Sequence, residues 1–491
     1  MTADETGTAP GWESEIVVGL VGPVGTDLET VERDLSERLV ALGYVCESIR
    51  ISELLKALSP GSPLPTSPEH HRLDAFMTAG NSLRQRLGRG DALALLAANK
   101  IHESRSPGAE PQPRRAHILR SLKHPDEVST LRTIYGPGFF LVGVWAGRIE
   151  RKAYLIDVKN IPESDADALI RRDDAERNAA DTGDEELGQR TRDTFRLADV
   201  FVKQRERNEL TRFVDLVFGD PFHTPTADEH GMYLAYASSL RSGDLSRQVG
   251  AVVLSAGGDV IATGANDAPK FGGGLYWPGA GDERDVVRGR DANELKRDEI
   301  LKDLDGKLTP HMKSGTPPIR ELIRGSALFD LTEFGRAVHA EMEALLSCSR
   351  NGISPRGGTL LTTTFPCHNC TKHLVAAGIL RVVFIEPYPK SLAKDLHDDA
   401  IQVIGESEGA ATSTGEEQRH VRFEQFSGVG PRRFFDLFSM SLSSGPVLIR
   451  KHEGVRSDWH PRVRVPMLPT SYIEREKAAA QSILSLVEVK T

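Results

Sequence analysis

The first 150 residues alternate between short apolar runs and longer segments with apolar residues every three or four positions. The apolar runs predict strands at 16–20, 44–51, 116–122 and 139–145, and the periodic segments predict helices at about 28–42, 72–87, 91–98 and 125–135. Strands that alternate with helices are typical of a parallel sheet covered by helices on both faces. The N-terminal half is therefore predicted to have an α/β fold.

A glycine-bearing loop follows the first predicted strand. Gly19, Gly22, Gly25 and Thr26 precede the first helix, which is the setting of a phosphate-binding loop. The pattern G-x-x-x-x-G-K-[ST] is not met, because Thr26 and Asp27 follow Gly25 and the lysine that contacts phosphates is missing. Three roles are open for this half: it retains phosphate transfer, it binds a nucleotide without transferring a phosphate, or it is purely structural or builds an oligomer. Basic residues of this half that could contact phosphates are Arg120, Lys123 and the pair Arg171-Arg172.

Two strings in the second half combine metal-binding and proton-accepting side chains. His339 lies in a predicted helix, 333–349, and Cys367 and Cys370 follow a predicted strand, 359–365. Pro366 suits the first position of a helix, which would place the two cysteines one turn apart. One imidazole and two thiolates leave a fourth tetrahedral position for water, as in catalytic zinc sites. Glu341 lies two residues beyond the histidine, where it can act as a base.

The alternative is a structural zinc site with four protein ligands. His368 and His373 are the candidates for a fourth ligand. In a catalytic site, zinc lowers the pKa of its water from about 16 to about 7. The arrangement H-x-E…P-C-x-x-C is the known signature of zinc nucleobase deaminases, which favours catalysis.

Residues 229–396 resemble the cytidine and deoxycytidylate deaminase family. The segments 237–242 and 247–253 look like the first helix and strand of that family, and Gly264-Ala265-Asn266 is similar to its G-x-N element. The resemblance implies one Zn²⁺ per chain, because the insert 267–338 contains no cysteine. It also implies that Glu341 shuttles a proton while hydroxide attacks C4 of cytosine and ammonia leaves. Implied substrate contacts are Arg247, Asn266, which could equally be a turn residue, and Tyr388, which could equally be a packing residue.

The whole arrangement resembles bacterial anti-phage dCTP deaminases that carry an N-terminal P-loop-kinase-like domain. This resemblance implies a parallel-sheet domain followed by an α/β/α cytidine-deaminase-like domain, conversion of dCTP to dUTP and ammonia in antiviral defence, and a homo-oligomer. A housekeeping dCMP deaminase that supplies dUMP for thymidylate synthesis is the alternative. An inactive nucleotide sensor and an editor of single-stranded nucleic acid are less compatible with Glu341 and with the acidic charge.

Length and composition set the remaining expectations. The 491 residues suffice for two or three domains: a tail at 1–13, the kinase-like domain at 14–220, the deaminase domain at 225–441 and an extension at 442–491. The net charge of −9 argues against a stable nucleic-acid partner, and a small-molecule nucleotide is expected instead, with a regulatory nucleotide possible at the N-terminal domain. No apolar run approaches the length of a membrane span. Four cysteines and a polar N-terminus indicate a cytoplasmic protein.

Overall fold

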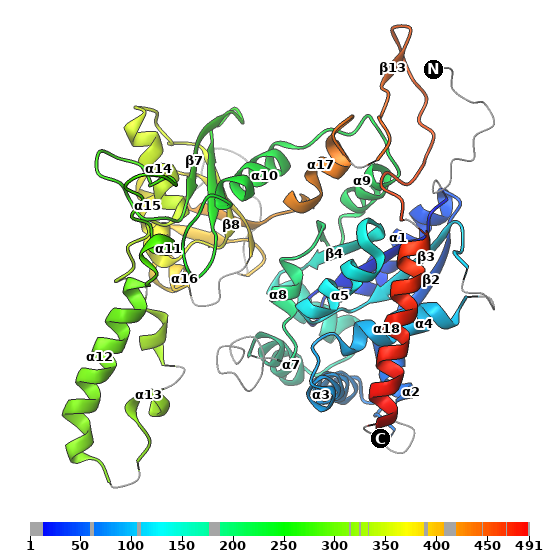
Figure 1. Ribbon diagram of the computed structural model, residues 1–491, viewed down its shortest axis with the longest axis horizontal. Coiled ribbons are helices and arrows are strands. Elements are labelled where there is room, and N and C mark those ends of the chain that lie inside the picture. Colours follow the sequence, from blue (N-terminus) through cyan, green and yellow to red (C-terminus); the bar gives the residue numbers. More distant parts are fainter. Residues whose placement is uncertain are drawn as a thin grey trace. The chain divides into compact units, whose positions relative to one another are not determined.

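The computed structural model divides the chain into two compact units. Unit 1 comprises Met1–Glu229 and Ser427–Thr491, and unit 2 comprises His230–Phe426 (Figure 1). The structure describes residues 13–58, 63–105, 110–175, 187–313, 316–323, 326–331, 333–386, 391–406, 419–443, 445–467 and 469–489. Unit 1 is therefore built from two separate stretches of sequence, with unit 2 inserted between them.

Unit 1 contains a six-stranded sheet in the order β12-β5-β4-β1-β3-β2. Its strands are β1 (Ile16–Val21), β2 (Val45–Arg50), β3 (Arg115–Arg120), β4 (Phe139–Trp145), β5 (Val200–Lys203) and β12 (Gly428–Val429). All neighbours are parallel except β12, which pairs antiparallel with β5. The parallel sheet expected from the apolar runs is confirmed.

Helices connect the strands of this sheet and cover it. They are α1 (Leu28–Ala41), α2 (Ile51–Ala57), α3 (Glu69–Leu87), α4 (Ala92–Glu103), α5 (Pro125–Tyr135), α6 (Arg148–Ala153), α7 (Glu163–Ala175), α8 (Thr191–Phe195), α9 (Arg207–Val217), α17 (Phe434–Phe438) and α18 (Pro469–Val489). Asp27 caps α1 by accepting a hydrogen bond from the Thr30 amide. Every third or fourth residue of α1, such as Leu35 and Leu39, packs on alternate residues of β1.

The C-terminal segment belongs to unit 1, although the deaminase domain was expected to extend to 441 and a separate extension to follow it. β12 completes the sheet, and α18 packs along α4 and α5 (Figure 1). A buried arginine anchors α18: Arg105 Nε donates to Glu476 Oε1 at 2.6 Å, and its Nη1 donates to Glu15 Oε1 at 2.8 Å. These three side chains are at most 1% exposed, so the loss of any one of them would leave a buried charge without its partner. The boundary at 441 is thus replaced by one at Phe426.

A histidine extends the same charged cluster. His117 is fully buried in β3, with Nε2 3.6 Å from Glu15 Oε1 and Nδ1 3.3 Å from Glu47 Oε2. Burial lowers the pKa of this imidazole, but the contacts with both glutamates outweigh burial and raise the pKa overall.

Unit 2 contains a second six-stranded sheet, in the order β10-β11-β9-β8-β6-β7. Its strands are β6 (Gly250–Leu254), β7 (Val260–Ala265), β8 (Thr359–Thr364), β9 (Arg381–Glu386), β10 (Ile401–Val403) and β11 (Val421–Gln425). The helices of this unit are α10 (Ala227–Ser239, which begins in unit 1), α11 (Asp285–Arg288), α12 (Ala292–Leu308), α13 (Ile319–Leu322), α14 (Ala340–Arg350), α15 (His368–Ala376) and α16 (Ala393–Leu396). β6 is antiparallel to β7 and β8, and the strands from β8 to β10 are parallel. α14 packs closely on β7, because a Cβ at Gly264 would lie 2.1 Å from the Ala340 carbonyl oxygen. This glycine lets the first metal-site helix approach the sheet.

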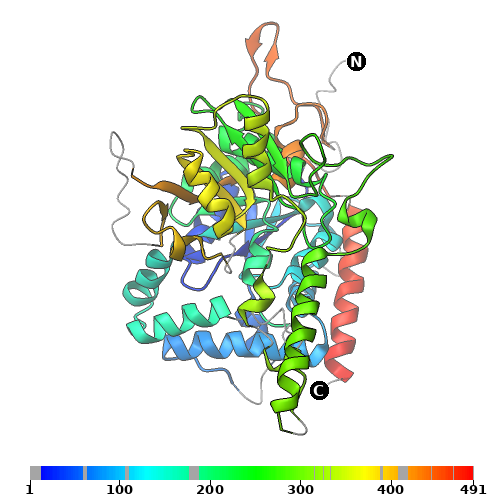
Figure 2. The ribbon, with the colours of Figure 1, turned by 90° about the vertical axis from the view of Figure 1, so that its left-hand side faces the viewer.

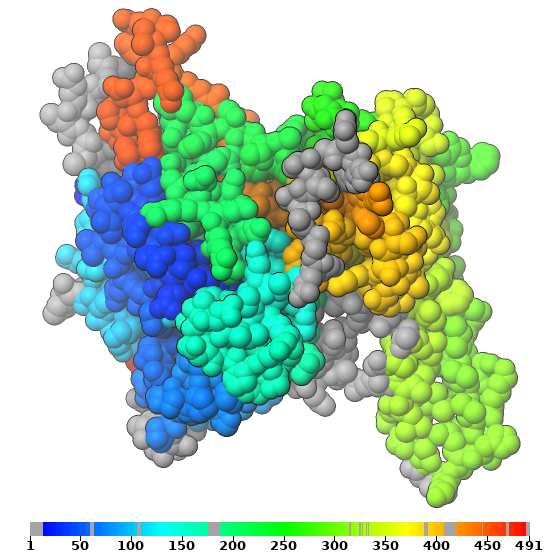
Figure 3. All heavy atoms as spheres, turned by 180° about the vertical axis from the view of Figure 1, so that it is seen from behind, coloured from blue at the N-terminus to red at the C-terminus, as the bar shows by residue number. Residues whose placement is uncertain are grey.

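The insert 267–338 closes at its base, where the Val338 amide donates to the Asp267 carbonyl at 2.9 Å. Beyond that base, α12 extends away from the sheet of its own unit (Figure 2). In unit 1, the hairpin of β13 (Lys451–His452) and β14 (Val455–Arg456) protrudes from the surface in orange-red (Figure 3). Among the described helices, none is both long and apolar enough to cross a membrane.

Candidate functional site

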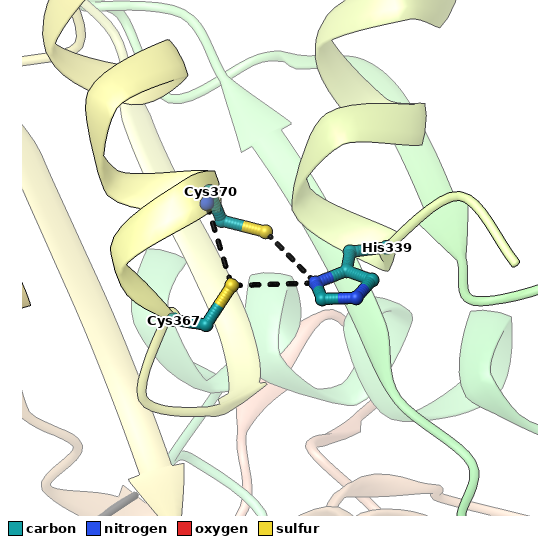
Figure 4. A group of neighbouring side chains, drawn as sticks. All are labelled: His339, Cys367 and Cys370. Atoms are coloured by element: carbon teal, nitrogen blue, oxygen red, sulfur yellow. Dashed lines mark hydrogen bonds between the residues drawn. The ribbon is translucent and has the colours of Figure 1, made fainter. Parts of the chain in front are cut away.

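The three expected metal ligands lie together where two helices of unit 2 begin. His339 is the residue before α14, with φ −66° and ψ 151°, so it lies outside the helix that was expected to contain it. Cys367 precedes α15 in the same way, and its Sγ accepts a hydrogen bond from the Cys370 amide at 3.4 Å. Pro366 is therefore not the first helical residue. Both helix starts direct their side chains toward one point (Figure 4).

The spacing of the three donor atoms suits a tetrahedral zinc ion. Nδ1 of His339 lies 3.4 Å from Cys367 Sγ and 3.3 Å from Cys370 Sγ. Zn–S and Zn–N bonds of about 2.3 and 2.0 Å in a tetrahedron would separate the donors by about 3.6 Å. Among the described residues, the group of donors at this place has these three members and does not include His368 or His373. The donor set thus fits zinc and leaves one tetrahedral position outside the protein's ligands.

The electrostatic environment of the three side chains shifts the pKa values of Cys367 and His339. Hydrogen bonds from Cys370 and His339 lower the pKa of the Cys367 thiol to about 4. The contact with Cys367 in turn raises the pKa of His339 to about 9. Both contacts favour the thiolate form of Cys367, which is the form that binds a metal. A bound metal would displace a proton from the His339 nitrogen that it occupies.

Glu341 lies in the first turn of α14 and is 3% exposed. Its Oε2 accepts from the Cys370 thiol at 3.6 Å, so the carboxyl group lies beside the three donors without being one of them. Burial raises the pKa of this carboxyl group. A carboxyl group with a raised pKa is suited to both accepting and returning a proton.

The expected substrate contacts have protein partners in the structure. Asn266 Oδ1 accepts from the Val249 amide at 2.6 Å, and its Nδ2 donates to the Arg247 carbonyl at 2.8 Å. The Arg247 guanidinium donates to Thr364 Oγ1 at 2.7 Å and lies 3.3 Å from Glu386 Oε1. Asn266 thus holds the segment 247–249 in place. Tyr388 lies outside the described residues.

Comparison with known proteins defines the family of the second unit. A family model described as "Cytidine and deoxycytidylate deaminase zinc-binding region" matches residues 225–386. The chain is similar to the deoxycytidylate deaminase of Enterobacteria phage T2, with 30% identity over 176 residues that cover 35% of this chain and 86% of that protein. The chain belongs to the cytidine and deoxycytidylate deaminase family.

Two further proteins are similar to this chain, one over a smaller share of its length and the other at a lower sequence identity. The deoxycytidylate deaminase of Enterobacteria phage T4 is 38% identical over 68 residues, which are 14% of this chain and 34% of that protein. The crystal structure of dCMP deaminase from the cyanophage S-TIM5 with dCMP and dUMP is 21% identical, with a TM-score of 0.23. That comparison covers 42% of this chain and 100% of the other.

The glycine loop of this deaminase lies in unit 1, at the rim of a pocket of about 510 Å³. Gly22, Gly25 and Thr26 line the pocket, whereas Gly19 lies inside β1, where a Cβ would be 2.6 Å from a Leu122 methyl group. Gly25 adopts φ +87°, which favours glycine. Gly19 is therefore a packing position.

A lysine remote in sequence reaches this loop. Lys123, beyond the end of β3, donates from Nζ to the Gly22 carbonyl at 2.7 Å. Lys123 is one of the basic residues expected to contact phosphates, but a lysine outside the loop pattern carries no signal that distinguishes it from its neighbours. Asp173 is buried in α7 and accepts a hydrogen bond from the loop.

Proposed function

We propose that this protein catalyses the zinc-dependent hydrolytic deamination of a deoxycytidine nucleotide, with dCTP as the substrate and dUTP and ammonia as the products. The observation that carries the proposal is the group of His339, Cys367 and Cys370 with the buried Glu341 beside it. A structural zinc site would need no buried carboxyl group next to its ligands.

The site residues divide into those that hold the metal and one that moves protons. His339 Nδ1 and the two Sγ atoms would hold the zinc ion. When bound, zinc supplies the Lewis acidity that brings the pKa of a water molecule near neutrality. A Glu341 carboxylate oxygen accepts the proton of the attacking water, gives it to N3 of the cytosine ring and assists departure of the amino group as ammonia. Glu341 is 3% exposed, so bulk water has little access to its carboxyl group.

A substrate panel tests this proposal. Purified full-length protein is incubated with cytidine, dCMP, dCDP, dCTP and CTP, and the products are identified by mass spectrometry. Fastest turnover of dCTP supports the proposal, and no turnover of any deoxycytidine nucleotide would refute it.

The second candidate is deamination of dCMP to dUMP for thymidylate synthesis. The names of the phage relatives, deoxycytidylate deaminases, favour it. Turnover of dCMP equal to or greater than that of dCTP in the same panel would select this candidate.

We further propose that the dCTP activity depletes the dCTP pool during phage infection. Support comes from the combination of a deaminase with a parallel-sheet unit that carries a glycine loop. Bacteria that express the wild-type protein should resist phage and lose dCTP, whereas bacteria that express Glu341→Gln should do neither. Equal resistance of both strains would refute the antiviral role. The protein is also expected to be a homo-oligomer, which light scattering of the purified chain tests.

The pocket of unit 1 supports a regulatory nucleotide as a further part of the proposal. β1 and β3 are neighbours in the sheet order β4-β1-β3-β2. The chain leaves β1 toward β2 at one edge of the sheet and leaves β3 in the opposite direction, toward β4. The carboxyl ends of two such strands border the crevice where α/β sheets bind ligands. Both connections line the pocket, whose volume suits one nucleotide. Nucleotides that bind there should change the rate of dCTP deamination, and a rate insensitive to all of them would contradict regulation.

A further inference from the structure

Asp173 places a negative charge at the glycine loop of unit 1. Its Oδ2 accepts a hydrogen bond from the Val24 amide at 3.0 Å, and its Oδ1 accepts from Thr191 Oγ1 at 3.3 Å. Lys123 Nζ lies 4.0 Å from Oδ1, and the Asp173 side chain is 3% exposed. In a loop that binds phosphate, backbone amides and a lysine ammonium face the ligand. Here the Val24 amide and the Lys123 ammonium group face the Asp173 carboxylate, which belongs to the same chain.

The rest of the loop keeps features of an anion site. Thr26 lines the pocket and is 8% exposed, and no hydrogen-bond partner for its Oγ1 lies among the described residues. A Cβ at Gly25 would lie 2.7 Å from the Arg151 carbonyl oxygen, so the close approach of the loop to α6 depends on glycine. The cationic side chains that line the pocket are Arg50, Lys56, Arg72, Arg84, Arg120, Lys123 and Lys159, against the anionic Glu29, Glu53 and Glu69.

We propose that the Asp173 carboxylate is an internal anion that competes with the phosphates of a nucleotide for the loop 22–26. The proposal rests on the proposed nucleotide site and concerns its regulation. A phosphorylated ligand must displace the carboxylate from the Val24 amide and Lys123, because two anions cannot share that position without strong repulsion. A nucleoside without phosphates does not meet this competition.

Calorimetric titration of the full-length protein with ATP, tripolyphosphate and adenosine tests the competition. Asp173→Asn removes the charge but keeps an oxygen that can accept from the Val24 amide. We expect ATP and tripolyphosphate to bind this variant at least about tenfold more tightly than wild type, and the response to adenosine to be unchanged. The matched control is Asp174→Asn: this neighbouring carboxylate lies 3.2 Å from Arg192 and 3.5 Å from Arg148, and we expect no comparable gain.

Unchanged or weaker ATP binding by folded Asp173→Asn would overturn the proposal, as would an equal gain in the control. If neither wild type nor variant binds either phosphate probe, the competition and the nucleotide site both fail. Deamination of dCTP, measured separately on the same samples, shows whether the zinc chemistry stands.

Hydrogen–deuterium exchange of wild-type protein gives a test that needs no variant. Saturating ATP should slow exchange at 22–26 and speed it at 169–175. Slower exchange in both segments would refute the displacement of Asp173.

Discussion

Replacement of Glu341 by glutamine separates proton transfer from metal binding. Glutamine has the size of glutamate but cannot accept the proton of the attacking water. General acid–base catalysis contributes about 10²–10⁴-fold, and at 3% exposure Glu341 has little contact with bulk water that could act in its place. We therefore expect kcat to fall by about 10³–10⁴-fold, which corresponds to about 4 to 5.4 kcal/mol of transition-state stabilisation. The kcat of dCTP deamination is measured by ammonia release, and the zinc content of the same sample by mass spectrometry.

The matched control is Glu343→Gln, two positions further along α14. Glu343 is also buried, but it pairs with Arg350 rather than facing the metal ligands. This variant should keep most of the wild-type kcat, and both variants should keep their zinc. Wild-type turnover by Glu341→Gln would refute its role as the proton shuttle, and loss of zinc from that variant would show that it supports the metal instead.

Three other changes test the metal site and the stability of unit 1. Cys370→Ser replaces a thiolate ligand by a weakly coordinating hydroxyl, so zinc should be lost on dialysis against a chelator; zinc retained at the wild-type level would contradict the ligand assignment. Arg105→Met removes the arginine that pairs two buried carboxylates and should lower the free energy of unfolding in urea by about 3–5 kcal/mol. Arg114→Met, at an exposed pair, should change it by less than about 1 kcal/mol. The pKa of His117 is higher in the folded than in the unfolded protein, so its stabilising contribution is complete below about pH 6.5 and is lost as pH rises through the folded pKa. The difference in free energy of unfolding between wild type and His117→Gln, measured by urea titration, should therefore shrink as the pH rises above about 6.5. A difference that stays constant with pH would contradict this role of His117.

The grouping of His339, Cys367 and Cys370 was predictable because much of its signal is local. The spacing within each string and the strand before the second string place the three side chains at or near helix starts. The helix boundaries were less predictable: His339 and Cys367 each occupy the position just before a helix, and apolar periodicity does not distinguish that position from the first turn.

The surroundings of the glycine loop depend on contacts between residues far apart in sequence. Val24 and Asp173, which share a hydrogen bond, are 149 positions apart. The position of α18 likewise depends on Arg105 and Glu476, which are 371 positions apart. A pairing of that kind leaves no periodic pattern in the sequence. The strands and most of the helices in the first 150 residues were therefore foreseen, whereas the membership of the C-terminal segment in unit 1 was not.

The discontinuity of unit 1 sets an order of events during protein synthesis. A ribosome releases the first 229 residues and then the whole of unit 2 before β12 and α18 exist. Unit 2 is continuous and can fold as soon as it emerges. Until residues 428–489 emerge, β5 lacks its partner β12 and the surface of α4 and α5 lacks α18, so unit 1 is expected to complete its fold after unit 2.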